Sequence, residues 1–134
     1  MKRSEIRELA FKLIYSLEIQ KEENLDDQID LFIENNNITD KNAVEYIKDT
    51  ILGIAKYKEE IDTFIKNSLT AEWKIERISK INLSLLKLAI YEIKYKDIPF
   101  KVEINEVVEL AKLYGEDTSS SFINGALAKF IKDL

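Results

Sequence analysis

The sequence contains only three glycines and one proline among its 134 residues. A fold built from many short strands needs more turn residues than this, whereas the abundant leucine, isoleucine, lysine, glutamate and alanine favour helices. A hydrophobic fraction of 46% is enough to form a packed core in a chain of this length. We therefore expect an all-α fold in a single compact helical domain, residues 1–134.

Apolar residues recur at helical spacing in the N-terminal part of the chain. They predict a helix from Arg3 to about Gln20 and a shorter helix that ends at the turn Asn35–Asn37. Thr39 or Asp40 is the expected N-cap of the next helix.

The apolar stripe from Val44 to Ile65 is the longest in the sequence and predicts one continuous helix. Its heptad-like spacing fits either a core helix of a bundle or the seam of a coiled-coil homodimer. Gly53 and the lysine at seam position 58 favour the bundle.

Residues 78–95 are apolar on almost every side, which predicts a central helix packed by both halves of the chain. Pro99 ends this helix, and two more helices are expected, one before and one after Gly115. The pattern lapses around Trp73, so we expect a joint there between an N-terminal half, about 1–70, and a C-terminal half, about 71–134.

Two residues interrupt the apolar pattern of the C-terminal half. Glu92 lies on the apolar stripe of the central helix, so we expect a buried carboxylate. Its predicted partners are backbone N–H groups or a side chain near the Ile98–Pro99 turn or on the following helix. Gly125 falls within helical spacing and is interpreted as a place where another helix approaches closely.

The sequence contains no cysteine and no histidine. This excludes disulfides, thiolate or imidazole metal sites and the usual nucleophile–histidine pairs. Gly-rich phosphate loops are also missing. We therefore expect no enzymatic activity, no catalytic residues, no metal site and no cofactor. A charged N-terminus and the lack of a long apolar run predict a cytoplasmic protein without a membrane segment.

The net charge of −5 is unevenly distributed along the chain. Residues 1–17 hold four basic and two acidic side chains, whereas residues 18–49 hold three and ten. Residues 73–101 return to seven basic and three acidic side chains. Two basic segments could therefore attract phosphate although the whole molecule is anionic.

On the first predicted helix, a turn of about 100° per residue places Arg7, Phe11 and Tyr15 in a row just beyond the apolar face, with Lys12 further round. Cations alternating with aromatic rings are typical of single-stranded nucleic-acid binding, although the same side chains could pack at a helix border.

Several motifs resemble the transcription antitermination factor NusB family over nearly the whole chain. The most specific are Ile104-Asn105-Glu106, Glu109 to Lys112 and Phe122-Ile123-Asn124-Gly125, and the segment Arg7 to Tyr15 resembles the opening helix of that family. The resemblance implies a helical fold of two packed three-helix sub-bundles. It also implies RNA contacts from the first helix and from the loop before the last one.

Two sets of functional residues follow from the pattern and the resemblance together. The expected RNA contacts come from both ends of the chain: Lys2, Arg3, Arg7, Phe11, Lys12, Tyr15, Tyr114, Thr118, Ser119 and Phe122. The candidate contacts for a protein partner are Glu76, Arg77 and Asn82.

The resemblance implies a factor that binds boxA-like single-stranded RNA together with NusE, a small-subunit ribosomal protein that also acts in transcription. In an antitermination complex it would promote read-through by RNA polymerase, notably in ribosomal RNA operons. Two alternatives remain at this point: a helical adaptor or homodimer without RNA, and the detached N-terminal domain of a ribosomal RNA methyltransferase.

Overall fold

The computed structural model describes residues 1–21, 24–70 and 74–134. Within these ranges the chain forms helices and no strand, which confirms the predicted all-α fold. Trp73, the predicted joint, lies outside them. The helices are α1 (Arg3–Gln20), α2 (Leu25–Asn35), α3 (Lys41–Lys56), α4 (Lys58–Ser68), the 3₁₀ turn η1 (Ile75–Arg77), α5 (Lys80–Tyr95), α6 (Phe100–Tyr114) and α7 (Ser119–Lys132).

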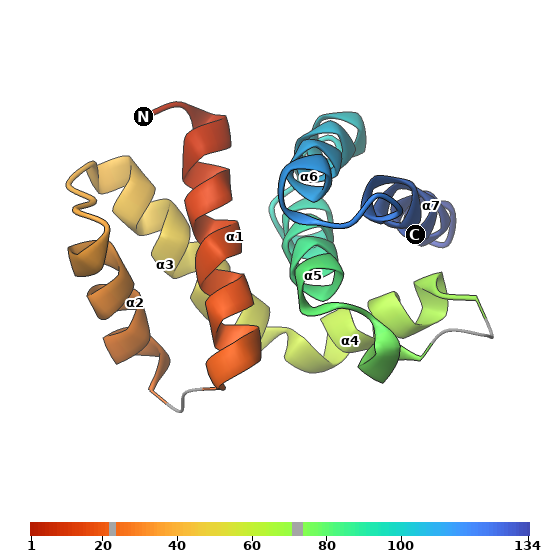
Figure 1. Ribbon diagram of the computed structural model, residues 1–134, viewed down its shortest axis with the longest axis horizontal. Helices are drawn as coiled ribbons and strands as arrows, with labels where there is room; N and C mark the ends of the chain where they lie inside the picture. The colour runs from red at the N-terminus through yellow and green to blue at the C-terminus, as the bar shows by residue number, and fades with distance from the viewer. Residues whose placement is uncertain (22–23, 71–73) are drawn as a thin grey trace.

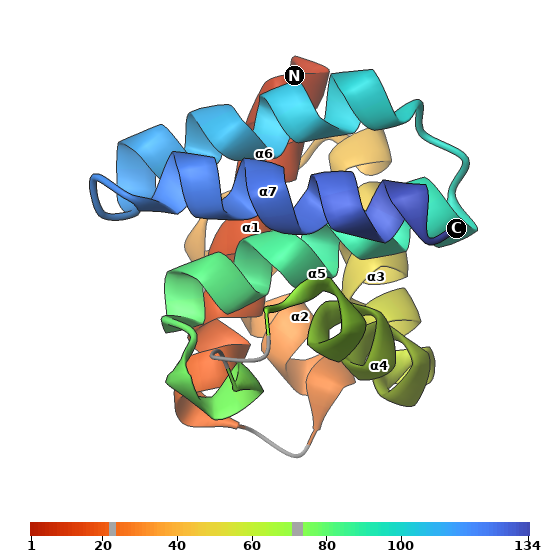
Figure 2. The same cartoon turned by 90° about the vertical axis from the view of Figure 1, so that its right-hand side faces the viewer.

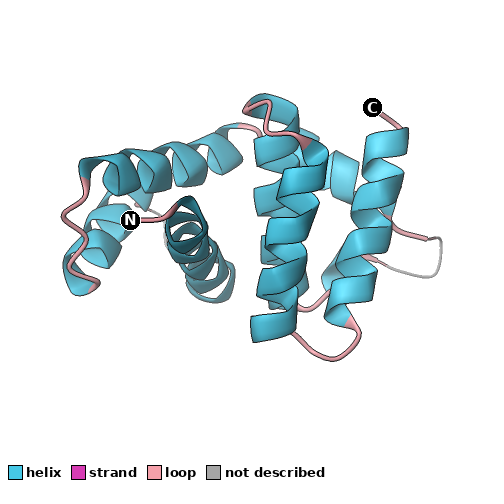
Figure 3. Cartoon of the chain, turned by 90° about the horizontal axis from the view of Figure 1, so that it is seen from above, coloured by secondary structure: helices cyan, strands magenta, loops and turns pink. Residues whose placement is uncertain are grey.

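The helices form two groups, as Figure 1 shows. Helices α1 and α2 pack on α3, and α5, α6 and α7 pack on one another, while α4 lies against α5 and α7. Seen from above, α6 and α7 run side by side and the C-terminus follows the end of α7 (Figure 3). None of the described helices is long and apolar enough to cross a membrane.

Helix α5 occupies the centre, as its sequence predicts. It contacts α1 and α3 on one side and α4, α6 and α7 on the other, and Figure 2 shows it running beneath α6 and α7. Its apolar side chains are buried around most of the helix, including Leu85, Leu86, Leu88 and Ile90. A helix buried on nearly all sides has no solvated face, which explains the almost continuous apolar run.

The prediction of one helix across the Val44–Ile65 stripe is wrong. The chain bends at Tyr57, between α3 and α4, where the Tyr57 ring stacks on Tyr95 with centroids 4.0 Å apart. The stripe residues Ile47, Ile51, Ile61 and Ile65 are all buried in the core of this chain. They are therefore not available as a coiled-coil seam, and the homodimer that depended on this seam is not supported.

A buried charged cluster joins the two groups of helices. Arg7 on α1 donates from Nε to Glu92 on α5 at 2.8 Å, and lies 3.4 Å from a carboxylate oxygen of Glu103 on α6. The hydroxyl of Tyr46 on α3 donates to the other oxygen of Glu92, also at 2.8 Å. The predicted burial of Glu92 is confirmed. The Glu92 carboxylate accepts hydrogen bonds from α1 and α3 and not from the Pro99 turn, whereas Glu103 of the following helix lies in the same cluster, as one of the predicted alternatives has it.

Glu103 is fully buried in this cluster, and neither carboxyl oxygen has a regular hydrogen bond within the described residues. The pKa of Glu103 is raised to about 10, first by burial and then by the neighbouring Glu92, whose effect is larger than the opposing effect of Arg7. Glu103 is therefore protonated at neutral pH. The interior then holds one guanidinium facing one fully buried carboxylate, which avoids an excess buried charge.

The helical glycines Gly53 and Gly125 have opposite surroundings. A Cβ at Gly53 would overlap the ring of Tyr91, whose hydroxyl donates to the carboxylate of Asp49 at 2.9 Å. A Cβ at Gly125 would meet nothing within 4 Å. The prediction that a helix approaches Gly125 closely is therefore wrong for this chain, and the close approach occurs at Gly53.

Replacing Glu103 by Gln should make stability less dependent on pH. Because the folded state raises the pKa of Glu103, its contribution to stability is complete below the ordinary value of 4.5 and is lost as pH rises toward about 10. Through this one group, the free energy of unfolding changes by at most about 1.4 kcal/mol per pH unit. Urea unfolding at pH 5, 7 and 9 should therefore show that the free energy of unfolding of Glu103→Gln increases relative to that of the wild type as pH rises. Glu109→Gln, an exposed change on the same helix, is the control. An identical pH dependence for wild type and Glu103→Gln would contradict the protonated state.

Alanine should have opposite effects at the two glycines. Gly53→Ala should destabilise the protein by about 1–3 kcal/mol, because the new methyl group overpacks against a buried ring. Gly125→Ala should stabilise by up to about 1 kcal/mol, because alanine lowers the entropy cost of an exposed helical position. Thermal and urea unfolding measure both changes. A change of the same sign at both positions would refute the close contact at Gly53 and the open surroundings of Gly125.

Candidate nucleic-acid interface

The second half of α1 meets the end of α6. The ring centroids of Phe11 and Tyr114 are 5.3 Å apart, and Nζ of Lys12 lies 5.8 Å from the centroid of Tyr114. The Tyr114 hydroxyl donates to the carboxylate of Glu8, and this hydrogen bond, with a smaller contribution from burial, raises the pKa of Tyr114 to about 12. The fold thus brings aromatic and basic candidates from both ends of the chain together.

Two of the predicted RNA contacts on α1 are not on the surface. Arg7 is 3% exposed and Phe11 is 2% exposed, so the expectation that they stand in a row beyond the apolar face is wrong. Helix α6 covers this side of α1 with Glu103, Glu106 and Tyr114. The guanidinium of Arg7 is occupied by carboxylates inside the protein, where it cannot reach RNA. Lys12 is exposed and Tyr15 is partly exposed.

The turn between α6 and α7 is held by Ser119. This residue is buried, and its hydroxyl accepts a hydrogen bond from the backbone N–H of Glu116 at 2.9 Å. A side chain at Gly115 would collide with Ser119, so glycine is needed there for space. Ser119 therefore shapes the turn and, contrary to the prediction, offers no exposed hydroxyl. Thr118 is exposed beside it.

An open groove of about 530 Å³ lies between the start of α5 and the start of α7. We call it the α5–α7 groove, and it is lined by Arg77, Ile78, Ser79, Asn82, Glu116, Thr118, Ser121 and Phe122. It joins two predicted RNA contacts, Thr118 and Phe122, to two predicted partner contacts, Arg77 and Asn82. Sequence reasoning missed Ser79 and Ser121, although the serine-rich segment before Phe122 was a signal for Ser121. Glu76 is exposed in the adjoining 3₁₀ turn.

Lys2 and Arg3 are exposed at the opposite end of α1. Arg3 lines a different groove, whose acidic residues include Asp40, Glu45 and Asp49. The surface between Arg3 and Lys12 is also acidic, because a third groove, between α1 and α6, is lined by Glu5, Glu8, Glu106 and Glu109. The structure therefore does not join Lys2 and Arg3 to the basic and aromatic groups near Lys12.

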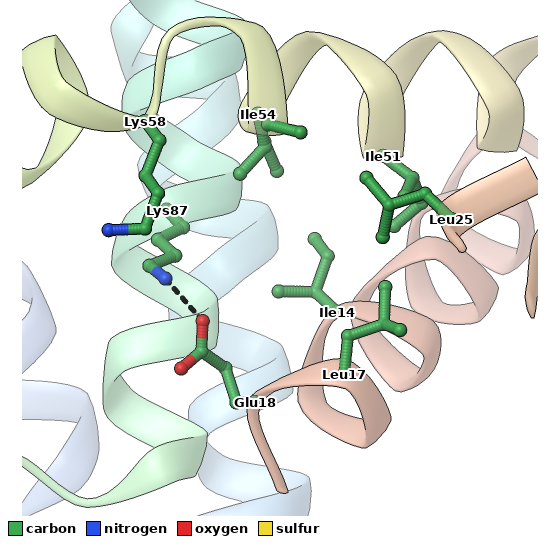
Figure 4. A pocket seen from close by; sticks show the side chains of 9 residues that line it. Ile14, Leu17, Glu18, Leu25, Ile51, Ile54, Lys58 and Lys87 are labelled. Carbon is green, nitrogen blue, oxygen red and sulfur yellow. Dashed lines mark hydrogen bonds and ion pairs between the residues drawn. The ribbon is translucent and has the colours of Figure 1, made fainter. Parts of the chain in front are cut away.

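An apolar pocket of about 160 Å³ lies beneath the second half of α1 (Figure 4). Ile14 and Leu17 from α1 face Ile51 and Ile54 from α3 across it. At its edge, Lys87 of α5 forms a largely buried ion pair with Glu18. This ion pair links the end of α1 to α5.

Comparisons with known proteins agree with this architecture. A model of the NusB family matches residues 4–132. The chain is 47% identical over 133 residues to the transcription antitermination protein NusB of Ruminiclostridium cellulolyticum, covering 98% of this chain and 90% of that protein. The corresponding protein of Acetivibrio thermocellus is 49% identical over 133 residues, with the same two coverages.

Solved structures show the same similarity in three dimensions. The NusB structure from T. maritima superposes with a TM-score of 0.90 at 31% identity, covering 99% of this chain and 92% of that one. A crystal structure of the antitermination factors NusB and NusE in complex with double-stranded RNA matches with a TM-score of 0.88 at 26% identity, covering 98% and 97%. Since the family model and the similar sequences each span nearly the whole chain, this protein belongs to the NusB family.

Proposed function

We propose that this protein is an RNA-binding transcription antitermination factor that acts with NusE on boxA-like single-stranded RNA. In a complex with RNA polymerase it promotes read-through, notably in ribosomal RNA operons, and its place of action is the cytoplasm. The observation that carries the proposal is the convergence of Lys12, Tyr15 and Tyr114 from the two ends of the chain on one surface. A structural relative that holds NusE and double-stranded RNA supports NusE and RNA as the partners.

The side chains on this surface fit the chemistry of unpaired RNA. Lys12 and Arg77 are exposed cations that can meet phosphates, and Tyr15 and Phe122 are partly exposed rings that can stack on bases. The hydroxyl of Thr118 and that of Ser121, which donates to the Thr118 carbonyl, add polar groups at the start of α7. These cations, rings and hydroxyls, taken together as the proposed RNA strip, suit contact with a few nucleotides.

The charges around this strip limit the affinity of the protein alone. Acidic side chains line both other grooves along α1, and the net charge is −5. Few phosphates can be neutralised on such a surface, so RNA binding by the protein alone should be weak and sensitive to salt. NusE, docked near Glu76, supplies additional contacts, so that the pair binds RNA more tightly than either protein. The role is one of assembly, without catalysis.

Charge and ring substitutions on the proposed surface should weaken the ternary complex. Phe122→Asp removes a stacking ring and adds negative charge, and should lower affinity about 5- to 100-fold. Lys12→Glu should lower it less and reduce the salt dependence. Fluorescence anisotropy with labelled boxA-like RNA and a scrambled RNA, with and without NusE, at two salt concentrations, measures these effects.

Two further variants serve as controls in this experiment. Lys132→Glu changes an exposed lysine at the far end of α7 and should leave binding unchanged. Arg7→Glu places a carboxylate against Glu92 and Glu103, so it should disrupt folding and is not a test of RNA contact. If the wild type with NusE bound boxA-like and scrambled RNA equally, the sequence-specific function would be refuted.

A further inference from the structure

The apolar pocket beneath the second half of α1 is a second concave site, which we call the α1–α3 pocket. Ile14 and Ile51 in its lining are buried, whereas Ala55 is exposed, so the pocket runs from the core to the surface. Its volume of about 160 Å³ is close to that of a cavity that holds one benzene molecule. The full apolar lining is Ile14, Leu17, Leu25, Ile51, Ile54 and Ala55. The pocket therefore has room for an apolar group of about six carbon atoms.

Three charged side chains complete the lining of the α1–α3 pocket. Glu18 of α1, Lys58 of α4 and Lys87 of α5 lie on one side of it, and the apolar side chains lie on the other (Figure 4). Lys87 is largely buried and forms an ion pair with Glu18. Lys58 is mostly exposed and forms an ion pair with Asp62, which is not part of the lining. The lining itself therefore carries two positive charges and one negative charge.

Both lysines can donate to a ligand in addition to their present partners. Lys87 donates to Glu18 and Lys58 donates to Asp62, which uses one of the three N–H donors of each ammonium group. A carboxylate at this side of the pocket would accept charge-assisted hydrogen bonds, which are stronger than neutral ones. The charge of Lys87 is only slightly screened by solvent, because its side chain is 11% exposed.

These two surfaces together favour a ligand that has an apolar part and an anionic part. A purely polar anion would leave the apolar lining uncovered and would gain nothing from burial. An amine would be repelled by two ammonium groups and attracted by one carboxylate. A pocket of this volume admits one short chain and is too small for a helix or a strand of a protein partner.

We propose that the α1–α3 pocket binds a small monocarboxylate. Its aliphatic chain, about four to six carbon atoms long, enters between α1 and α3, and its carboxylate meets Lys58 and Lys87. This inference goes beyond the proposed function, because no residue of the pocket belongs to the proposed RNA strip. The ligand would contact α1 and α3 with its chain and α4 and α5 with its carboxylate. It would therefore stabilise the packing of these helices.

The length of the chain provides the first test. Thermal unfolding of the full chain is measured with straight-chain carboxylates from propionate to heptanoate. A ligand that binds only the folded protein raises the melting temperature as its concentration increases, which gives the affinity. Each added methylene should strengthen binding about fourfold until the pocket is filled near hexanoate, and longer chains should gain little.

Isoleucine methyl NMR locates the bound chain. On addition of hexanoate, the methyl resonances of Ile51 and Ile54 should shift, because both side chains line the pocket. The resonance of Ile65, which is buried in α4 outside the pocket, should not shift.

The charge of the ligand provides the second test. The wild type should bind hexanoate more tightly than 1-hexanol or hexylamine. Lys58→Gln should weaken the binding of hexanoate about 2- to 5-fold and leave that of 1-hexanol unchanged, because an exposed ion pair contributes modestly. Lys56→Gln, which changes an exposed lysine of α3 outside the pocket, is the matched control and should bind hexanoate like the wild type.

Filling the pocket provides the third test. Ala55→Phe places a ring in the pocket and should abolish binding of hexanoate and of 1-hexanol alike. The substituted position is exposed, so the core should keep its packing, and the isoleucine methyl spectrum of the free variant checks this.

Three results would overturn the proposal. The first is a melting temperature that none of the carboxylates raises. The second is an affinity that does not depend on chain length, or methyl shifts outside the pocket, which would remove the site. The third is equal binding of hexanoate and hexylamine by the wild type, which would remove the carboxylate. None of these results bears on RNA binding, which the anisotropy experiment tests separately.

Discussion

The hydrogen bond between Arg7 and Glu92 is the contact on which the arrangement of the two helix groups depends. It joins side chains 85 positions apart in the sequence at 2.8 Å, and both are buried. Tyr46 and Glu103 extend the contact to α3 and α6, so four helices share one polar centre. Removing Arg7 or Glu92 would leave the other charge buried without its partner, which typically costs about 3–5 kcal/mol. This penalty favours a single position of α1 against α5 and α6.

The same contact decides which side chains reach the surface. Because α6 lies over Arg7 and Phe11, the basic and aromatic side chains that reach the surface in the second half of α1 are Lys12, which is exposed, and Tyr15, which is partly exposed. They lie beside the Tyr114 end of α6, which leads through the Gly115–Ser119 turn into the α5–α7 groove. The buried ion pair thus positions the proposed RNA surface without belonging to it.

The distribution of charge further restricts which side chains can belong to the proposed RNA surface. Carboxylates line the grooves on both sides of the first turns of α1, so Lys2 and Arg3 stand apart from Lys12. A phosphate backbone is repelled by these carboxylates and attracted by Lys12 and Arg77. Such a charge pattern supports contact with only a few nucleotides. A second protein then supplies the remaining contacts.

The sequence by itself determined the helical class, the central α5, a helix cap at Thr39 or Asp40, the break at Pro99 and the burial of Glu92. These features depend on local chemistry, such as apolar spacing along one helix, capping oxygens and the missing N–H of proline. The family motifs likewise identified the fold and the relatives, because they consist of particular residues at fixed spacing along the chain.

Only the tertiary structure decided what lies against each helix. Arg7 stands at the border of the apolar face of α1, and its burial depends on α6, which follows almost a hundred residues later. Gly53 and Gly125 have the same helical context in the sequence, yet only Gly53 has a ring packed against it. The apolar stripe through Tyr57 gave no sign of the bend between α3 and α4. Spacing along a helix reports which face is apolar, whereas the partner of that face is set by packing between segments far apart in the chain.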